Sequence, residues 1–377
     1  MRFAPVIAAV SGVVLFAGCA SDPQPEPESV VSDNRIRSVQ ADIDGVVGAG
    51  VTGAIATVTE NGKTVALTSG VADTATAAKI PTDPPQQVRV GSIAKTFTSA
   101  IVLQLVSDGK IRLDEPIDTY LPGVVHGQGI DGRAITVRQI LRHQSGIPDF
   151  AKDERVDEYR AALQNRTMTP DEAIAIIMSK PADFAPGARY EYSNSNYIIA
   201  GVLVERVTGA RYVDELDRRI LKPLGLNDTY LPGPGERDIR GPHPKGYAEI
   251  DGVLTDVSRI EPSVPWAAGA MVSTGADLNH FYTALLSGKV LPANELQEMR
   301  NGVPIGEGLG VTMQYGLGVG TVQLPCGAEY FGHTGGIYGF LSFSGATPEG
   351  RAVTYTFTKP PKDLPDLSAL LSHALCP

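Results

Sequence analysis

The chain has 377 residues, of which 42% are hydrophobic and 20% are charged. This length and composition exclude a disordered, fibrous or coiled-coil chain, and they fit two or three domains or one large domain with an insertion. Asp and Glu number 42 against 32 Lys and Arg, which gives a net charge of −10. Because no run is rich in Lys and Arg, we expect no nucleic-acid partner.

The N-terminus is predicted to be an export signal over residues 1–18. Phe3–Ala17 is apolar, and its 15 residues are fewer than a membrane span needs. The signal ends in Leu15-Phe-Ala-Gly-Cys19, which resembles the bacterial lipobox although a Phe replaces the usual Leu. We expect Cys19 to be lipidated and to anchor the protein to the outer face of the cell membrane, in the cell envelope. An ordinary cleavage that releases a soluble protein is the alternative.

Residues 19–34 are predicted to be a disordered tether, because three prolines and three acidic residues follow Cys19 with almost nothing to bury. The chain has three cysteines. With Cys19 lipidated, Cys326 and Cys376 remain, an even number in an oxidising compartment. We expect these two to form a disulfide that ties the C-terminal tail to the body. Two reduced, buried thiols are the alternative.

The folded body begins with a predicted helix over residues 33–48, where Ile and Val recur at helical spacing. Two strands, 51–59 and 63–71, flank Asn61-Gly62, a dipeptide that favours a tight hairpin turn. Helices follow through the middle of the chain, several of them ended by a glycine. The predicted middle helices are 93–106, 137–142, 170–178, 196–207 and 277–286.

At the C-terminal end, strands over 339–346 and 351–358 flank a turn, and an apolar helix over 367–375 closes the chain. Strands at both chain ends favour an α/β fold: one antiparallel sheet built from both ends, flanked by helices, with an inserted, mainly helical subdomain. We expect one domain over 35–377, with its sheet part at about 35–90 and 290–377 and its helical part at about 91–289.

Ser92-Ile-Ala-Lys95 opens the predicted 93–106 helix and places a hydroxyl and an amine on one helical face. Serine is a weak nucleophile until a base takes its proton, and free N–H groups at a helix N-terminus stabilise an oxyanion. Ser92 and Lys95 are therefore candidates for attack and activation, with a simple helix cap as the alternative. The same spacing in Ser107–Lys110 is interrupted by the glycine that ends the helix.

Two further motifs follow in the order Tyr192-Ser-Asn194 and His333-Thr-Gly-Gly336. With Ser92-Ile-Ala-Lys95 they resemble the active-site set of the serine penicillin-recognising family, which contains DD-peptidases, class C β-lactamases and related esterases. Connecting segments such as Ile135–Gly146 and Ala268–Thr274 also look like family segments. The His-Thr-Gly variant and the cysteine seven residues before it resemble exported D-alanyl-D-alanine carboxypeptidases most. The resemblance implies a β-lactamase/transpeptidase-like fold.

The resemblance also implies a role for each motif residue. Ser92 would be the nucleophile, Lys95 its activator and Tyr192 the proton shuttle to the leaving amine, with either Lys95 or Tyr192 as the base. The backbone N–H groups of Ser92 and Gly336 would form the oxyanion hole. A protonated His333 would help Lys95 to lower the pKa of Tyr192, and a neutral His333 that only donates a hydrogen bond is the alternative. Substrate contacts are implied for Asn194, which would also hold Lys95, and for Thr334, Gly335, Gly336 and Trp266.

One departure from the family pattern concerns the substrate carboxylate. DD-carboxypeptidases of this type commonly bind it through an arginine shortly before the His-Thr-Gly strand and through hydroxyls on that strand. Here Met313–Tyr330 contains no Arg or Lys, and Gly336 stands where a hydroxyl residue often lies. Only Thr334 remains as a local partner, and a lone hydroxyl binds a carboxylate more weakly than a guanidinium does.

We interpret the chain as an exported serine acyl-enzyme hydrolase, in first place a D-alanyl-D-alanine carboxypeptidase that acts on peptidoglycan stem peptides and is acylated by penicillins. A β-lactamase or an esterase of the same fold is the close alternative, and a surface binding protein on a decayed hydrolase fold is a more distant one. The expected partners are a stem peptide or a β-lactam, and the membrane through the lipid anchor. No cofactor or metal is expected, because the other histidines lack the spacing of zinc ligands.

Overall fold

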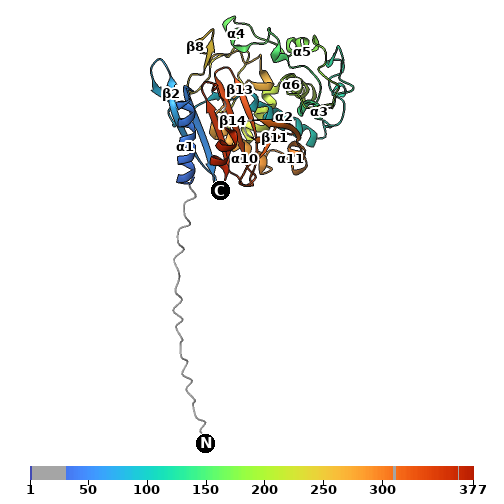
Figure 1. Ribbon diagram of the computed structural model, residues 1–377. Helices are drawn as coiled ribbons and strands as arrows, with labels where there is room; N and C mark the ends of the chain where they lie inside the picture. Colours follow the sequence, from blue (N-terminus) through green and yellow to red (C-terminus); the bar gives the residue numbers. More distant parts are fainter. Residues whose placement is uncertain (2–30, 309–310, 364) are drawn as a thin grey trace.

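The computed structural model describes residues 1, 31–308, 311–363 and 365–377. Its centre is a nine-stranded sheet in the order β10-β11-β12-β13-β14-β15-β1-β2-β3 (Figure 1). The strands are β1 (Gly53–Glu60), β2 (Lys63–Asp73), β3 (Ala78–Lys79), β10 (Val303–Gly308), β11 (Val311–Tyr315), β12 (Gly320–Gln323), β13 (Glu329–Ile337), β14 (Phe340–Ala346) and β15 (Ala352–Phe357). The predicted signal peptide and Cys19 lie outside the described residues.

The two ends of the chain meet in the middle of this sheet. β1 pairs antiparallel with β15 on one side and with β2 on the other. The turn between β1 and β2 has φ values of 51° at Asn61 and 74° at Gly62, which suit the tight turn that this dipeptide favours. The predicted α/β fold with an antiparallel sheet from both chain ends is confirmed.

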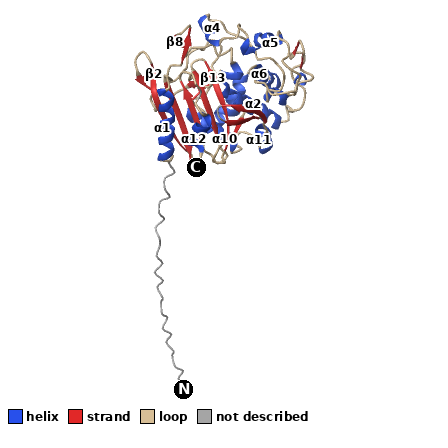
Figure 2. Ribbon diagram, in the orientation of Figure 1, coloured by secondary structure: helices blue, strands red, loops and turns tan. Residues whose placement is uncertain are grey.

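Helices cover the sheet and fill the inserted part, most of which lies to one side of the strands (Figure 2). No helix in the described part of the chain combines the length and apolar character needed to cross a bilayer. The α-helices are α1 (Asp33–Gly48), α2 (Ala94–Ser107), α3 (Val137–Leu141), α4 (Glu158–Leu163), α5 (Pro170–Met178), α6 (Ser195–Thr208), α7 (Tyr212–Leu216), α8 (Lys222–Leu224), α9 (Trp266–Gly269), α10 (Gly275–Leu286), α11 (Ala293–Arg300) and α12 (Leu367–Leu375).

Two cores lie on opposite sides of the sheet. α1 and α12 pack their apolar residues on one face, around Val39, Leu371 and Val353. α10 packs on the other face, where its Asn279 side chain donates a hydrogen bond to the carbonyl oxygen of Thr57 on β1 at 3.0 Å. α10 therefore belongs to the sheet layer, although it falls within 91–289, the range predicted for the helical subdomain.

Local signals explain the helix ends. The Ser32 side chain accepts from the backbone N–H of Arg35, so α1 begins at Asp33 and the predicted tether boundary at residue 34 is two residues too late. Thr169 and Glu172 form a reciprocal capping box at the start of α5. Five helices of eight residues or fewer were not predicted, because so short a run gives a weak helical periodicity: α4, α7, α8, α9 and α11.

The C-terminal tail is fastened at two points. Cys326, in the turn between β12 and β13, lies at disulfide distance from Cys376 at the end of α12, as the cysteine count predicts. The buried Arg35 of α1 donates to the carbonyl oxygens of Ala374 and Cys376, at 2.8 Å each. Its guanidinium also pairs with Glu60 at 2.9 Å. The first and last helices are therefore joined through polar as well as apolar contacts.

Removing the disulfide by Cys326→Ser with Cys376→Ser is predicted to lower the free energy of unfolding by about 4 kcal/mol, because the two cysteines are 50 residues apart and the bond restricts the unfolded chain. Urea unfolding of the oxidised protein and of the double variant checks the value. A reducing agent should have no effect on the double variant. Equal stability, or labelling of both thiols in the denatured, unreduced wild type, would refute the bond.

Candidate active site

Ser92 lies in a 3₁₀ turn, η1 (Gly91–Ile93), that runs directly into α2. Gly91 has φ +52°, and a Cβ at this position would lie 2.7 Å from the carbonyl oxygen of Gly336. The position needs glycine, because both the left-handed backbone and the close approach of β13 exclude a side chain. The turn thus places Ser92 against the second half of β13.

The second half of β13 has a free edge beside this turn. β12 pairs only with Glu329–Gly332, whereas β14 pairs with Phe331–Ile337. The turn packs closely against this half of β13, and a Cβ on Gly335 would lie 1.9 Å from the carbonyl oxygen of Val90. Gly336 is exposed, so its backbone borders solvent next to Ser92. The oxyanion hole of the Ser92 and Gly336 backbone N–H groups stays a prediction.

Lys95 is fully buried one turn after Ser92. Its Nζ lies 2.9 Å from Ser92 Oγ, 2.8 Å from Asn194 Oδ1 and 2.6 Å from the carbonyl oxygen of Ala268. Burial lowers the pKa of Lys95 to about 7, against a smaller opposing effect of Asp149. The amide and carbonyl oxygens only accept, so they take two N–H groups of the amine. In the neutral form the lone pair then faces the Ser92 hydroxyl, as a general base requires.

Asp149 orients Asn194, and it was not predicted from the sequence. The backbone N–H of Asn194 donates to Asp149 Oδ1 at 3.0 Å, and its Nδ2 donates to Asp149 Oδ2 at 3.1 Å. Because the amide nitrogen is bound to a carboxylate, the amide oxygen must face Lys95. Asp149 also caps the short turn Phe150–Lys152. Nothing in the sequence distinguishes it from an ordinary capping residue.

Tyr192 donates its hydroxyl hydrogen to Ser92 Oγ at 2.7 Å. Burial raises the pKa of Tyr192 well above its usual value, and the bond to Ser92 offsets this only in part. The expectation of a lowered Tyr192 pKa is therefore wrong, because the loss of solvent outweighs the nearby lysine. The phenol is protonated at rest and suited to donate a proton. Of the two candidate bases, the geometry favours Lys95.

His333 is buried on β13. Its Nδ1 donates to the carbonyl oxygen of Thr334, and its Nε2 accepts from the Tyr315 hydroxyl at 2.9 Å. Burial first, and the neighbouring Lys95 second, lower the pKa of His333 to about 3. The expectation of a cationic His333 is therefore wrong, and a neutral ring held between two partners replaces it. Tyr315 holds the His333 ring through this hydrogen bond, and nothing in the sequence indicates that the two residues are in contact.

Trp266 has a packing role. Its ring lies 5.5 Å from the ring of Tyr212 on α7, and a Cβ on Gly201 of α6 would lie 2.8 Å from it. These contacts pack the partly exposed indole against α6 and α7, and its predicted place in the substrate cleft stays a prediction. The backbone of α9, which begins at Trp266, does reach the site, because the carbonyl oxygen of Ala268 accepts from Lys95.

A cavity of about 100 Å³ adjoins the reacting side chains. Tyr192, His333 and Thr334 border it together with apolar and tyrosine side chains, including Tyr190 and Tyr315. The segment from Ile305 to Tyr330, which supplies much of its wall, contains no Lys or Arg. Within the described residues, no three His, Cys, Asp or Glu side chains are placed to hold a metal ion. Among the residues that the structure places around this cavity, none carries a charge.

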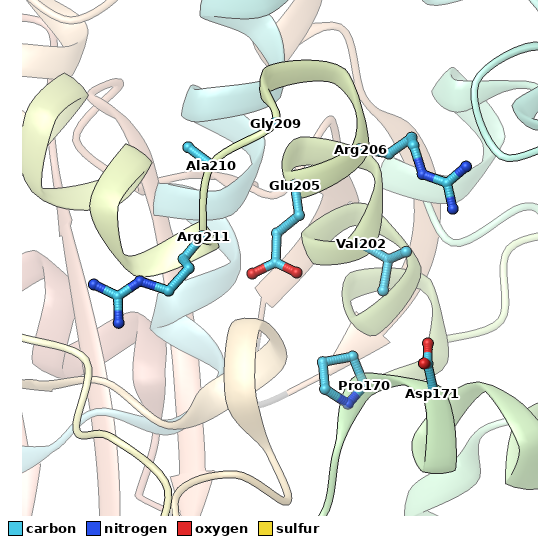
Figure 3. A pocket seen from close by; sticks show the side chains of 8 residues that line it. All are labelled: Pro170, Asp171, Val202, Glu205, Arg206, Gly209, Ala210 and Arg211. Atoms are coloured by element: carbon cyan, nitrogen blue, oxygen red, sulfur yellow. The ribbon is translucent and has the colours of Figure 1, made fainter.

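A wider hollow of about 570 Å³ lies at the C-terminal end of α6, where Glu205 points between Arg206 and Arg211 (Figure 3). Asn194 lies at the other end of this 14-residue helix. A helix of that length spans about 20 Å. The hollow is therefore remote from Ser92, and the Glu205 carboxylate in it already accepts from the backbone N–H of Tyr212 at 2.8 Å.

Comparison with known proteins extends the similarity to nearly the whole described body. The family described as "Beta-lactamase" matches residues 39–374. A D-stereospecific amidohydrolase from Streptomyces sp. is 36% identical, with a TM-score of 0.81 over 90% of this chain and 98% of its own. D-amino acid amidase from Ochrobactrum anthropi SV3 is 27% identical, with a TM-score of 0.77 over 90% of this chain and 96% of its own.

Among curated proteins, the penicillin-binding protein PbpX of Bacillus subtilis (strain 168) is 27% identical over 225 residues. The match covers 58% of this chain and 51% of that protein. Protein flp of Staphylococcus aureus (strain MW2) is 26% identical over 61% of this chain and 45% of its own length. The chain spans about half the length of the curated relatives it matches.

Acylation of Ser92 by a chromogenic cephalosporin is predicted to have a kcat/KM that rises with pH and levels off above about pH 7, because Lys95 must be neutral to accept the Ser92 proton and its pKa is about 7. At lower pH, Lys95 is protonated and can no longer accept the Ser92 proton. Stopped-flow rates between about pH 5 and pH 9 check this. Lys95→Ala should be slower by about 10²–10⁴-fold and should lack the acid limb. An unchanged acid limb in Lys95→Ala would contradict the assignment.

His333→Gln is predicted to keep the midpoint of the same pH profile, since burial holds the native ring neutral, with a pKa of about 3. The plateau should fall by about tenfold or less, because the change disturbs one or two hydrogen bonds. The measurement is the same acylation series on wild type and variant. A midpoint that moves by about one pH unit or more would restore the idea that the His333 charge assists catalysis.

Proposed function

This chain belongs to the Beta-lactamase family, and we propose that it is a D-stereospecific amidohydrolase that forms an acyl-enzyme on Ser92. It is a serine hydrolase of the β-lactamase and penicillin-binding fold. One arrangement carries the proposal: Lys95 Nζ at 2.9 Å and the Tyr192 hydroxyl at 2.7 Å both contact Ser92 Oγ. The nucleophile, a base and a proton donor thus meet at one atom.

The reaction follows from these contacts. As Ser92 Oγ attacks the amide carbon, its proton passes to Lys95, and the backbone N–H groups of Ser92 and Gly336 face the oxyanion. Tyr192 then gives its proton to the leaving amine as the C–N bond breaks, and protonated Lys95 restores the phenol. Water attacks the resulting ester with the same groups in reverse, which releases the acid and frees Ser92.

The cavity beside Tyr192 supports an uncharged leaving amine. Tyr192 protonates the leaving amine in the proposed reaction and also borders the cavity, so we place the leaving group there. The cavity is bordered by Tyr190, Tyr315 and apolar side chains, and Ile305–Tyr330 offers no cation for a carboxylate. We propose D-amino acid amides as the substrate class. The similarity to a D-stereospecific amidohydrolase and to a D-amino acid amidase supports the same class.

A D-alanyl-D-alanine carboxypeptidase that acts on peptidoglycan stem peptides is the second candidate. The similarity to the penicillin-binding protein PbpX and the His-Thr-Gly motif at His333 favour it. Both candidates use the same acylation chemistry at Ser92 and differ in the leaving group, which is ammonia or a simple amine in one case and D-alanine in the other.

Hydrolysis of D-phenylalanine amide is predicted to exceed that of the L-amide and of a peptide ending in D-alanyl-D-alanine by about tenfold or more in kcat/KM. The similar amidohydrolase is D-stereospecific, and the described lining of the cavity beside Tyr192 offers no cation to the carboxylate of a leaving D-alanine. Released ammonia and D-alanine are measured on the wild type, with Ser92→Ala as the inactive control. Faster release of D-alanine would replace the amidase by the carboxypeptidase. If neither product forms while a penicillin still acylates Ser92, a penicillin-binding role remains.

We further propose that the protein is exported and anchored by a lipid on Cys19. The support is the apolar Phe3–Ala17 segment, the lipobox-like Leu15–Cys19, and a cysteine pair that suits an oxidising compartment. Expression in a bacterial host should give a membrane-bound form whose N-terminal peptide carries diacylglycerol by mass spectrometry. Cys19→Ser should be released from the membrane, and equal release of the wild type would refute the anchor.

A further inference from the structure

His143 is a fully buried histidine directly beneath the active site. It follows α3 and has φ +57°, which is uncommon for a residue other than glycine. Its Nδ1 accepts from the backbone N–H of Ser193 at 3.2 Å and lies 3.1 Å from Nδ2 of Asn196. The Asn196 orientation is fixed because its Oδ1 accepts from the Ser145 hydroxyl. Two donors at Nδ1 leave the ring proton on Nε2.

The His143 ring packs against tyrosines of the site. Its centroid lies 4.3 Å from that of Tyr192, with the planes tilted by 36°, and 5.1 Å from that of Tyr315. Within the described residues, its Nε2 is buried and has no hydrogen-bond partner. A buried N–H without a partner is costly, so this ring is held against the tyrosines at the expense of stability.

These contacts reach Tyr192 from two directions. The ring limits how far the Tyr192 ring can tilt, and the bond to the Ser193 N–H holds the backbone immediately after it. The Tyr192 hydroxyl must stay 2.7 Å from Ser92 Oγ and still reach the leaving nitrogen. We propose that His143 is a positioning residue that holds the Tyr192 phenol in place for proton donation to the leaving group. The inference rests on the proton-donor role of Tyr192 in the proposed function.

Electrostatics agree with this role. Burial first, and Lys95 and His333 next, lower the pKa of His143 well below its usual value. The ring is therefore neutral, and Nδ1 remains an acceptor for the Ser193 N–H. A charged ring would lose that bond and would place a second cation near Lys95. The contacts of His143 Nδ1 with Ser193 and Asn196 thus require a neutral imidazole ring.

Two variants separate the two contacts. His143→Asn tolerates positive φ and keeps a short acceptor but lacks the ring, whereas His143→Phe keeps a ring but leaves the Ser193 N–H without its acceptor. His280→Asn is the control, because His280 is exposed on α10. If one of the two His143 variants does not fold, the other variant still tests whether His143 positions Tyr192.

Two reagents distinguish positioning from general disruption. Acylation by a β-lactam needs a proton for the leaving nitrogen, while a fluorophosphonate probe releases fluoride and needs only an activated Ser92. We expect acylation by the β-lactam to slow by about tenfold or more in the folded His143 variants, with probe labelling within about threefold of wild type. His280→Asn should be unchanged in both. Equal losses with both reagents, or no loss with either, would overturn the proposal.

A double variant gives a second test. If His143 acts through Tyr192, His143→Asn should cost little further acylation rate in a Tyr192→Phe background, because the proton donor is already gone. The full single-variant loss in that background would also overturn the proposal. Failure of the proposed substrate class would appear separately, as an enzyme that is acylated by the β-lactam but releases no product from D-amino acid amides.

Discussion

The chemistry of this site depends on the burial of the Lys95 amine. Lys95 is removed from solvent, and its three partners, the Ser92 hydroxyl, the Asn194 amide oxygen and the Ala268 carbonyl, take up all of its hydrogen-bonding capacity. Burial brings its pKa to about 7, so that a lysine acts as a base near neutral pH. Because each partner comes from a different part of the chain, the packing of the helical part around α2 sets the chemistry of Ser92.

The fold joins its two parts at the same point. The turn that carries Ser92 lies against β13, where Gly91 and Gly336 approach so closely that no side chain fits at Gly91. The sheet that contains β13 is built from both chain ends and is tied by the Arg35 contacts to the C-terminal tail. β13, which contacts this turn and pairs with β14, therefore links Ser92 to the rest of the sheet.

Apart from the Asp149 carboxylate behind Asn194, the side chains around Lys95 are neutral. Burial and a neighbouring lysine lower the pKa of His143 and His333 and keep both rings neutral, whereas burial raises the pKa of Tyr192 and keeps its proton in place. Such surroundings orient the phenol and the amine by packing and hydrogen bonds, without a second cation. The described lining of the cavity beside Tyr192 also offers no cation to a carboxylate, only hydroxyl groups such as that of Thr334, and this is the physical basis for proposing an uncharged leaving group.

The sequence by itself determined the features that depend on neighbouring residues. The 33–48 helix, the Asn61-Gly62 hairpin and the Ser92–Lys95 spacing follow from contacts within a few residues. That Tyr192, Asn194 and His333 share a site with Ser92 was implied by the family resemblance of the three motifs. Only the tertiary structure decided the protonation of that site and the parts played by Asp149, His143 and Tyr315. The reason is that a pKa depends on how much water is excluded and which groups face the side chain, and segments far apart in sequence supply both.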